Sequence, residues 1–322
     1  MTTPAALVRI DDATPVASLG ARPCALVVGN FDGVHRGHQA VLGEAVEEAR
    51  KLGLDACVLT FDPHPAGVVG RGAPPMLTTI ERRVALVGEM GVDRVYVRRF
   101  DAAFAAWPPE RFARELVAGA LLARLVVVGQ NFRFGAKRAG DLELLRALGR
   151  ELGFEARVHA IASDARGPFS STRARDAIGA GDLDEAARVL GRPHGLTGAV
   201  AHGDERGRQL GFPTANLEPV AEMLPPDGVY AVRVARRDDG GTAWHPLALG
   251  VTNIGVRPTV DGKRRTVEAH LLDFTGDLYG ARLRLDLVGR LRPETKFSSL
   301  DELKAQIARD VAAARHALVS AG

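Results

Sequence analysis

The segment 25–42 places a short apolar run, a turn and the start of a helix in immediate succession, and this order restricts the folds that the chain can adopt. The apolar run ALVV ends at a glycine, which is typical of a strand buried on both faces. Asn30, Asp32 and Gly33 follow, and residues of these types tolerate tight or left-handed backbone. From His35 onward apolar residues recur at helical spacing. The segment therefore predicts a strand that is followed by a glycine turn and a helix, with the N-terminus of the helix attracting phosphate.

Two histidines, His35 and His38, stand at the start of the expected helix. Their ring N–H groups suit a group that gains negative charge during reaction, such as the phosphate oxygens around an attacked phosphorus. A solvated helix start is an alternative interpretation, and a pair of metal ligands is another. No third and fourth ligand occurs at a zinc-like spacing, which disfavours a metal.

The rest of the first half alternates strand-like and helix-like segments. Such alternation predicts a parallel, doubly wound sheet with helices on both faces. Ligands of such sheets bind at the carboxyl ends of the strands. We expect an edge strand at 7–10, further strands at 56–61, 94–97, 125–129 and 156–159, and helices from Thr78 or Thr79 to Met90, from Pro108 to Ala118 and from Asp141 to Leu152.

Three further motifs of the first half follow expected strands or precede a helix: FDPHP at 61–65, VGQNFRFG at 128–135 and FSSTRAR at 169–175. Serine and threonine ahead of a helix are ordinary caps. Paired hydroxyls beside Arg173 and Arg175 also suit a phosphate clamp, because arginine matches phosphate oxygens bidentately. Neither a GxGxxG nor a GxxxxGK[ST] motif is present, so dinucleotide oxidoreduction and P-loop hydrolysis lack their usual signatures.

With GNFDGVHRGHQ, these motifs resemble the FAD synthetase branch of the HxGH nucleotidyltransferase superfamily. Two positions depart from the family pattern: Ala174, where a larger aliphatic residue is expected, and Asn131, where many relatives carry aspartate. The first departure concerns packing, and the second makes a charge role at that position doubtful. The resemblance implies catalytic roles for His35 and His38 and an ATP site formed by Gly29, Phe31, Asp32, His35, His38, Arg133, Ser171, Thr172 and Arg175.

Beyond a short helical segment at 182–190 the pattern changes to β-segments separated by Gly, Pro and Asp turns. They predict an antiparallel barrel or sandwich followed by a helix from about Ser299 to Leu318, capped by Ser298 or Ser299. We therefore expect two domains, residues 1–182 and 183–322, as the length of the chain also suggests. The expected strands span 196–201, 228–236, 245–250, 266–274 and 281–291.

The second half carries a glycine-rich stretch, 198–211, followed by the sequence FPTAN. Dense glycines mark β-turns and bulges, or let backbone approach phosphates closely. Thr214 and Asn216 offer hard oxygen ligands of the kind that Mg²⁺ accepts beside phosphates. In the expected strand 266–274, Glu268 shares a face with His270, and a solvated outer face is the simplest interpretation.

These stretches resemble the riboflavin kinase module, which has a small Greek-key barrel. The resemblance implies that Glu268 is the catalytic base, and that Thr214 and Asn216 bind Mg²⁺. It further implies a kinase ATP site formed by Gly203, Gly207, Arg208, Thr214 and Asn216.

The two resemblances together cover essentially the whole chain, in the order of the bacterial bifunctional riboflavin kinase/FAD synthetase family. They imply MgATP-dependent phosphorylation of riboflavin to FMN and adenylylation of FMN to FAD, with the flavins as substrates and products rather than prosthetic groups. Two alternatives are an enzyme with a single working half and a non-enzymatic flavin-sensing or RNA-binding module. Assays of the separate reactions distinguish the first, and a steep salt dependence of RNA binding would indicate the second.

Charge and cysteine content bear on partners and location. Up to Asp182 there are 23 Lys and Arg against 21 Asp and Glu, and afterwards 19 against 18. This balance argues against a basic face built for nucleic acid. Cys24 and Cys57, both in expected buried strands, are typical of a reducing compartment, and no apolar run approaches the length of a membrane span. We expect a cytoplasmic protein without membrane or nucleic-acid partners, and its oligomeric state stays open.

Overall fold

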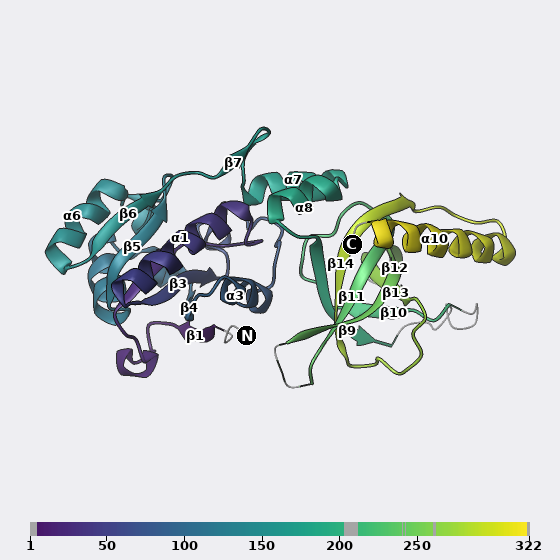
Figure 1. Cartoon of the computed structure of the whole chain (residues 1–322), viewed down its shortest axis with the longest axis horizontal. Coiled ribbons are helices and arrows are strands. Elements are labelled where there is room, and N and C mark those ends of the chain that lie inside the picture. Colours follow the sequence, from purple (N-terminus) through teal and green to yellow (C-terminus); the bar gives the residue numbers. More distant parts are fainter. Residues whose placement is uncertain (1–4, 203–211, 240, 242, 260–261, 321–322) are drawn as a thin grey trace. The chain divides into compact units, whose positions relative to one another are not determined.

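The computed structural model describes residues 5–202, 212–239, 241, 243–259 and 262–320. It divides into two compact units, each shown in Figure 1. The sheet unit comprises Met1–Pro75 and Thr79–Ser170, and the barrel unit comprises Met76–Thr78 and Ser171–Gly322. A parallel sheet followed by a closed antiparallel barrel and a final helix confirms the predicted fold class. In the described ranges no helix combines the length and apolarity needed to cross a membrane.

The sheet unit is built on six parallel strands in the order β1-β4-β3-β2-β5-β6. In the inner strand β2, Leu26 and Val28 pack into one core, while Ala25 and Val27 pack into the core on the opposite face of the sheet. Alternate side chains of a strand point to opposite faces, so burial of both sets explains the continuous apolar run. The strands are β1 (Ala6–Ile10), β2 (Cys24–Val28), β3 (Asp55–Asp62), β4 (Arg94–Arg99), β5 (Ala123–Gly129) and β6 (Glu155–His159).

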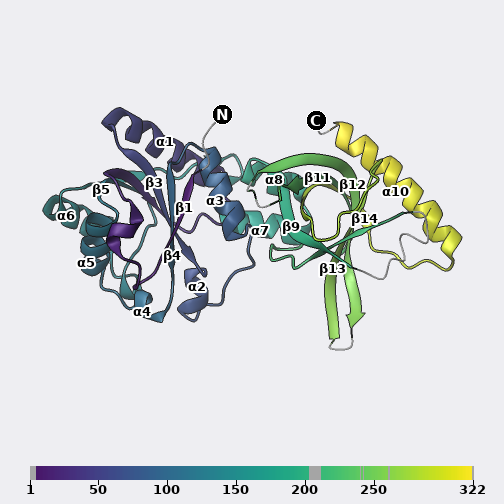
Figure 2. The same ribbon diagram turned by 90° about the horizontal axis from the view of Figure 1, so that it is seen from below.

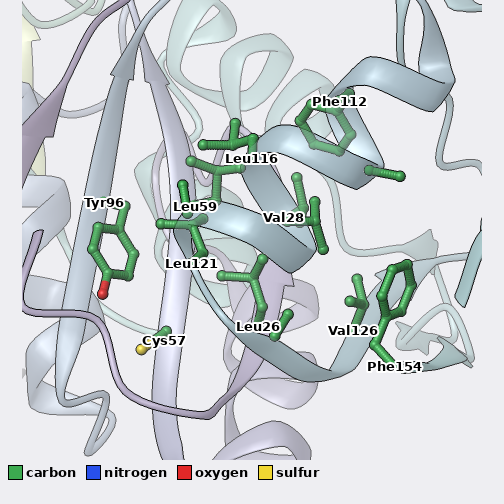
Figure 3. Packing of buried hydrophobic residues seen from close by; sticks show 14 of the residues in the cluster. Leu26, Val28, Cys57, Leu59, Tyr96, Phe112, Leu116, Leu121, Val126 and Phe154 are labelled. Carbon is green, nitrogen blue, oxygen red and sulfur yellow. The ribbon is translucent and has the colours of Figure 1, made fainter. Parts of the chain in front are cut away.

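Helices cover both faces of the sheet. Figure 3 shows Leu116 and Leu121 in the same core as Leu26 and Val28, and this core lies on the face opposite to the one that α1 covers. The helices at 80–89 and 142–152 begin after the predicted caps Thr79 and Asp141. The helical segments are η1 (Val16–Leu19), α1 (Arg36–Leu52), α2 (Pro65–Val68), α3 (Ile80–Glu89), α4 (Ala102–Ala105), α5 (Pro109–Arg111), η2 (Phe112–Ala120), η3 (Ala136–Arg138) and α6 (Leu142–Leu152), and a small hairpin joins β7 (Ser163–Asp164) to β8 (Gly167–Pro168).

The helix predicted from Pro108 to Ala118 differs from expectation. After the short α5 the chain continues as the π-helix η2. A Cβ at Gly119 would lie 2.9 Å from the carbonyl oxygen of Arg114, so glycine permits the close approach in this widened turn. A hydrophobic pattern at helical spacing does not distinguish a π-helix from an α-helix over two turns.

The barrel unit contains a closed six-stranded barrel in the order β10-β13-β12-β11-β14-β9. Figure 2 shows β12 and β13 continuing beyond the barrel as a two-stranded ribbon, which explains why β12 is much longer than the predicted strand 245–250. Helix α10 packs against the barrel wall (Figure 1). The elements are α7 (Ser171–Ala180), α8 (Leu183–Leu190), β9 (His194–Ala201), β10 (Ala215–Glu218), β11 (Gly228–Arg237), β12 (Trp244–Thr259), β13 (Gly262–Leu271), β14 (Arg282–Pro293) and α10 (Leu300–Ser320).

Helices α7 and α8 lie on either side of the predicted domain boundary after Asp182, and both belong to the barrel unit. Asp182 is the N-cap of α8, where its side chain accepts a hydrogen bond from the backbone N–H of Glu185. The boundary between functional domains stays a prediction.

The barrel unit holds a buried carboxyl whose titration should be visible in its stability. Glu222 is 4% exposed and accepts hydrogen bonds from the hydroxyl and the N–H of Thr197 at 2.6 and 3.3 Å. Burial raises the pKa of Glu222 above its ordinary value, against the lowering effect of these bonds. The pKa of Glu222 is therefore higher in the folded state than in the unfolded state. Its contribution to the free energy of unfolding is fully present below the unfolded pKa of about 4.3, and it is lost as the pH rises through the folded pKa.

Substituting Glu222→Gln should remove this dependence, since the amide stays neutral at every pH. We expect the thermal unfolding midpoint of the barrel unit to fall less between pH 4 and pH 8 in the variant than in the parent protein. Calorimetry of the full chain across this range checks it. Parallel decline of the two proteins would show that Glu222 ionises in the folded state without cost.

Candidate active sites of the two units

The turn after β2 differs from the prediction, because residues other than the expected ones also adopt the left-handed backbone conformation. Gly33 has a φ of 83°, as predicted, but Phe31 and Val34 also have positive φ, at 50° and 40°. Both side chains are buried, and the ring of Phe31 packs under Gly29, where a Cβ would lie 3.1 Å from it. Burial of these side chains therefore outweighs the local preference that favoured the polar turn residues.

The two histidines at the start of α1 lie side by side. His35 is the N-cap, and its Nδ1 accepts a hydrogen bond from the backbone N–H of His38 at 3.3 Å. The two rings stack with centroids 3.6 Å apart. A Cβ at Gly37 would lie 3.1 Å from the His35 ring and 3.1 Å from the carbonyl oxygen of Phe169, which explains the glycine between them. The spacing of the motif thus sets two imidazoles at one helix N-terminus.

These histidines open onto a cavity of about 270 Å³ at the carboxyl ends of β2, β5 and β6. The strand order reverses between β2 and β5, and open α/β sheets bind ligands at this switch point. Gly29, Phe31, His35 and His38 all line the cavity, together with Gly129 and His159 of the neighbouring strands. Four of the residues predicted for the ATP site are therefore brought together.

A larger cavity of about 660 Å³ adjoins the first, and the sequence analysis did not predict it. Gly29 and Asn131 line both cavities. The larger one has an aromatic wall in which the centroids of neighbouring rings lie 5.1 to 6.3 Å apart. That wall consists of Phe61, Phe100, Phe104, Trp107, Phe112, Phe132 and Phe134. The cavity is also lined by the basic residues His64, Arg71, Arg133, Lys137 and Arg138.

Arg133 and Asp32, both predicted to bind ATP, lie elsewhere than the smaller cavity. Arg133 lines the larger one and donates a hydrogen bond to the carbonyl oxygen of Phe132 at 2.9 Å. Asp32 is 2% exposed, with its Oδ1 3.5 Å from the buried guanidinium of Arg83 on α3. Arg83 also lies 3.4 Å from the carbonyl oxygen of Phe61. The geometry gives Asp32 a place beneath the turn rather than in the cavity.

The predicted phosphate-clamp residues stand at the start of α7 in the barrel unit. Ser171 and Arg175 are half-buried and Thr172 is exposed. The neighbouring Arg173 has its Nη2 2.6 Å from the carboxylate of Glu185 on α8, and both side chains are largely buried. Arg173 thus links α7 to α8 through an ion pair. This makes it a weaker candidate than Arg175 for binding phosphate.

In the barrel unit, Glu268 lies in a row of polar residues that crosses three strands. The pairing register sets Asn216 of β10 on one side of it and Asn253 of β12 on the other. Directly opposed residues of antiparallel strands have neighbouring side chains on one face. The predicted base and the predicted magnesium ligand Asn216 are therefore adjacent, and Asn253 is a further member of the row, for which the sequence predicts no role.

Two cavities meet at Thr214. One, of about 320 Å³, is lined by Glu268, Asn253 and residues of α10, and the other, of about 560 Å³, by Phe274 and Tyr279 among others. Thr214 lines both of them. Its position is fixed from the neighbouring strand, since the His270 ring Nδ1 lies 2.9 Å from the carbonyl oxygen of Pro213.

The oxygen donors at this junction fit a magnesium ion carried by a nucleotide. In the portion of the chain that the structure describes, no group of three or more His, Cys, Asp and Glu side chains is arranged to hold a metal. A hydroxyl and an amide oxygen alone make a partial set, which suits Mg²⁺ because it takes most of its ligands from phosphates and water. Gly203, Gly207 and Arg208, also predicted for the kinase ATP site, lie outside the described residues.

Comparisons with known proteins identify a family for each half of the chain. The family model for FAD synthetase matches residues 19–173, and the model for riboflavin kinase matches residues 190–318. The bifunctional riboflavin kinase/FMN adenylyltransferase of Escherichia coli K12 is 44% identical over 91% of this chain and 92% of its own. The chain belongs to this family. The family's enzyme from Bacillus subtilis strain 168 is 35% identical over 88% of this chain and 89% of its own.

A solved structure also covers both modules of the bifunctional family. It is named a macrolide-efflux protein from Streptococcus pneumoniae, with a TM-score of 0.82, 30% identity, and coverage of 96% of this chain and 99% of its own. The efflux name belongs to the pneumococcal protein, while its fold matches the sheet and barrel described above.

Proposed function

We propose that this family member catalyses both reactions, phosphorylating riboflavin in the barrel unit and adenylylating FMN in the sheet unit. One observation carries the proposal: each unit has a pair of cavities that meet at residues of its motif, Gly29 in one and Thr214 in the other. A transfer between two substrates needs adjoining sites, so that the reacting atoms are held in line.

In the sheet unit, we assign ATP to the smaller cavity and FMN to the larger one. The aromatic wall suits the flat isoalloxazine ring, and the basic lining suits the FMN phosphate. This phosphate is already nucleophilic, so attack on the ATP α-phosphorus needs alignment and no protein base. His35 and His38 would stabilise charge on the phosphate oxygens and on the departing pyrophosphate. The prediction that Ser171, Thr172 and Arg175 bind phosphate rests on the resemblance of their motif alone.

In the barrel unit, a protein base is required because a riboflavin hydroxyl is a poor nucleophile at neutral pH. We assign riboflavin to the cavity lined by Glu268, and ATP to the cavity beyond Thr214. The Glu268 carboxylate would take the hydroxyl proton as the oxygen attacks the γ-phosphorus. Thr214 and Asn216 would hold Mg²⁺, which neutralises charge on the transferred phosphoryl group.

A time course with riboflavin and MgATP tests the function. We expect FMN to appear first and FAD to accumulate afterwards together with pyrophosphate, because each product feeds the next reaction. The measurement is chromatographic separation of the three flavins. Formation of FMN without FAD would leave only the kinase working, and FAD formed only from added FMN would leave only the adenylyltransferase.

We also place the enzyme in the cytoplasm, acting on small molecules. Cys24 and Cys57 are buried and free, in keeping with a reducing compartment. Flavins and ATP would be its partners, and the near-neutral charge balance of both halves argues against a basic face built for nucleic acid.

A further inference from the structure

Asn30 stands at the point where the two cavities of the sheet unit meet. It follows Gly29, which lines both, and its own side chain lines the larger, aromatic cavity. Its backbone is fixed, because its carbonyl oxygen accepts a hydrogen bond from the Thr60 hydroxyl at 2.9 Å. The Asn30 side-chain amide lies against the His64 ring, with Nδ2 3.3 Å from Nε2.

The proton arrangement of His64 determines which end of that amide faces it. His64 is the N-cap of α2, and its Nδ1 accepts a hydrogen bond from the backbone N–H of Ala66 at 3.2 Å. A neutral ring that accepts at Nδ1 carries its proton on Nε2, so Nε2 is a donor. An amide NH₂ is a donor as well and cannot bond to it. A half-turn of the amide, which exchanges two atoms of nearly equal size, presents Oδ1 to the ring.

The NH₂ group of Asn30 is then turned away from His64, and the residue that carries it lines the larger cavity. Within the described residues, the amide makes no side-chain hydrogen bond other than the one with His64. We infer that this NH₂ group binds the phosphate of the flavin nucleotide, with His64 as the positioning residue that fixes the amide. The inference rests on the proposed function, since it takes FMN to occupy the larger cavity.

The chemistry of the step favours an amide at this place. The FMN phosphate must point one oxygen at the ATP α-phosphorus, and Asn30 adjoins Gly29, one of the residues that line both cavities. A guanidinium there would hold the phosphate but withdraw negative charge from the attacking oxygen. A neutral N–H donor orients the phosphate and leaves its charge in place. The same contact would select FMN over riboflavin, which lacks the phosphate.

A fluorescence titration separates this contact from the rest of the pocket. The chain has two tryptophans, and Trp107 lines the larger cavity, so Trp244→Phe leaves Trp107 as the sole reporter. In that background, FMN and riboflavin are titrated without ATP, and each should quench Trp107 as its isoalloxazine ring enters the aromatic wall. The parent should bind FMN more tightly than riboflavin.

Asn30→Asp keeps the size of the side chain and an acceptor for His64, but sets a carboxylate where the NH₂ group stood. We expect FMN affinity to fall about 10- to 100-fold, since hydrogen bonds to charged groups carry energies of that order, and riboflavin affinity to stay unchanged. Asn30→Ala should lower FMN affinity less, because it removes the donor without adding a negative charge. His64→Ala should add little to Asn30→Ala, because the two residues act through one contact.

Equal loss of FMN and riboflavin binding in Asn30→Asp would overturn the inference, because it would indicate distortion of the whole cavity. Unchanged FMN binding would overturn it as well. In both cases the proposed function stands if the parent enzyme still forms FAD from FMN and MgATP. A parent that neither forms FAD nor shows quenching of Trp107 by FMN would overturn the proposed function and this inference together.

Discussion

Replacing His38 by alanine is expected to lower FMN adenylylation about 10²- to 10³-fold while riboflavin phosphorylation continues at the parent rate. The His38 ring stacks on His35 at 3.6 Å and lines the cavity assigned to ATP. Loss of one donor aimed at developing charge costs a rate factor of this size, because water in the vacated space is not preorganised.

Rates with FMN and with riboflavin, measured separately on the same preparation, test this expectation. His245→Ala is a matched control, because His245 is an exposed histidine of the barrel unit, paired with Asp238, that lines none of the four cavities described. If the kinase rate fell with the adenylylation rate in a folded His38→Ala enzyme, the assignment of the two reactions to separate units would be wrong.

The sequence predicts what depends on neighbouring residues. The strand, turn and helix of 25–42 appear as β2 and α1 with His35 as cap, because apolar period and capping are local properties. The same holds for the caps Thr79, Asp141 and Asp182. The short strand β10 was missed, since its four residues follow a turn-rich stretch and acquire their pairing from β9 and β13, distant in sequence.

The larger cavity could not be predicted for a related reason. Its aromatic residues come from β3, α4, η2, the loops on either side of α4 and the loop before η3. They extend from Phe61 to Phe134, and each is an ordinary apolar residue in its own segment. The sequence offers Arg173 and Arg175 together as a phosphate clamp because the two lie two positions apart in one motif. The ion pair of Arg173 with Glu185 depends on the angle between α7 and α8, which no local pattern reports.

The two units answer different chemical demands with different residue types. A phosphate nucleophile needs alignment, and the sheet unit offers imidazoles, an amide and a helix N-terminus around its cavities. A hydroxyl nucleophile needs a proton acceptor, and the barrel unit offers a carboxylate in a row of amides. This contrast leads to the sharpest test in the barrel.

Glu268→Gln is expected to lower riboflavin phosphorylation about 10²- to 10⁴-fold, the usual contribution of a general base. Glu268 is half-buried between Asn216 and Asn253 in the pairing register. Glutamine keeps the size of the side chain and its capacity for hydrogen bonding but cannot take the proton. Conversion of FMN to FAD should survive, since His35 and His38 lie in the sheet unit.

Glu218→Gln is the matched control. Glu218 lies on β10, two residues beyond Asn216, and its carboxylate pairs with Arg264 at 3.3 Å. It lines neither of the barrel cavities. An exposed carboxylate of this kind costs within about 0.5 kcal/mol of stability when replaced, and nothing in rate. Kinetics with riboflavin and with FMN decide between the two interpretations of Glu268. A Glu268→Gln enzyme that phosphorylates riboflavin at the parent rate would make this residue an ordinary member of a polar strand face, and the base would have to be sought elsewhere in the cavity beside Thr214.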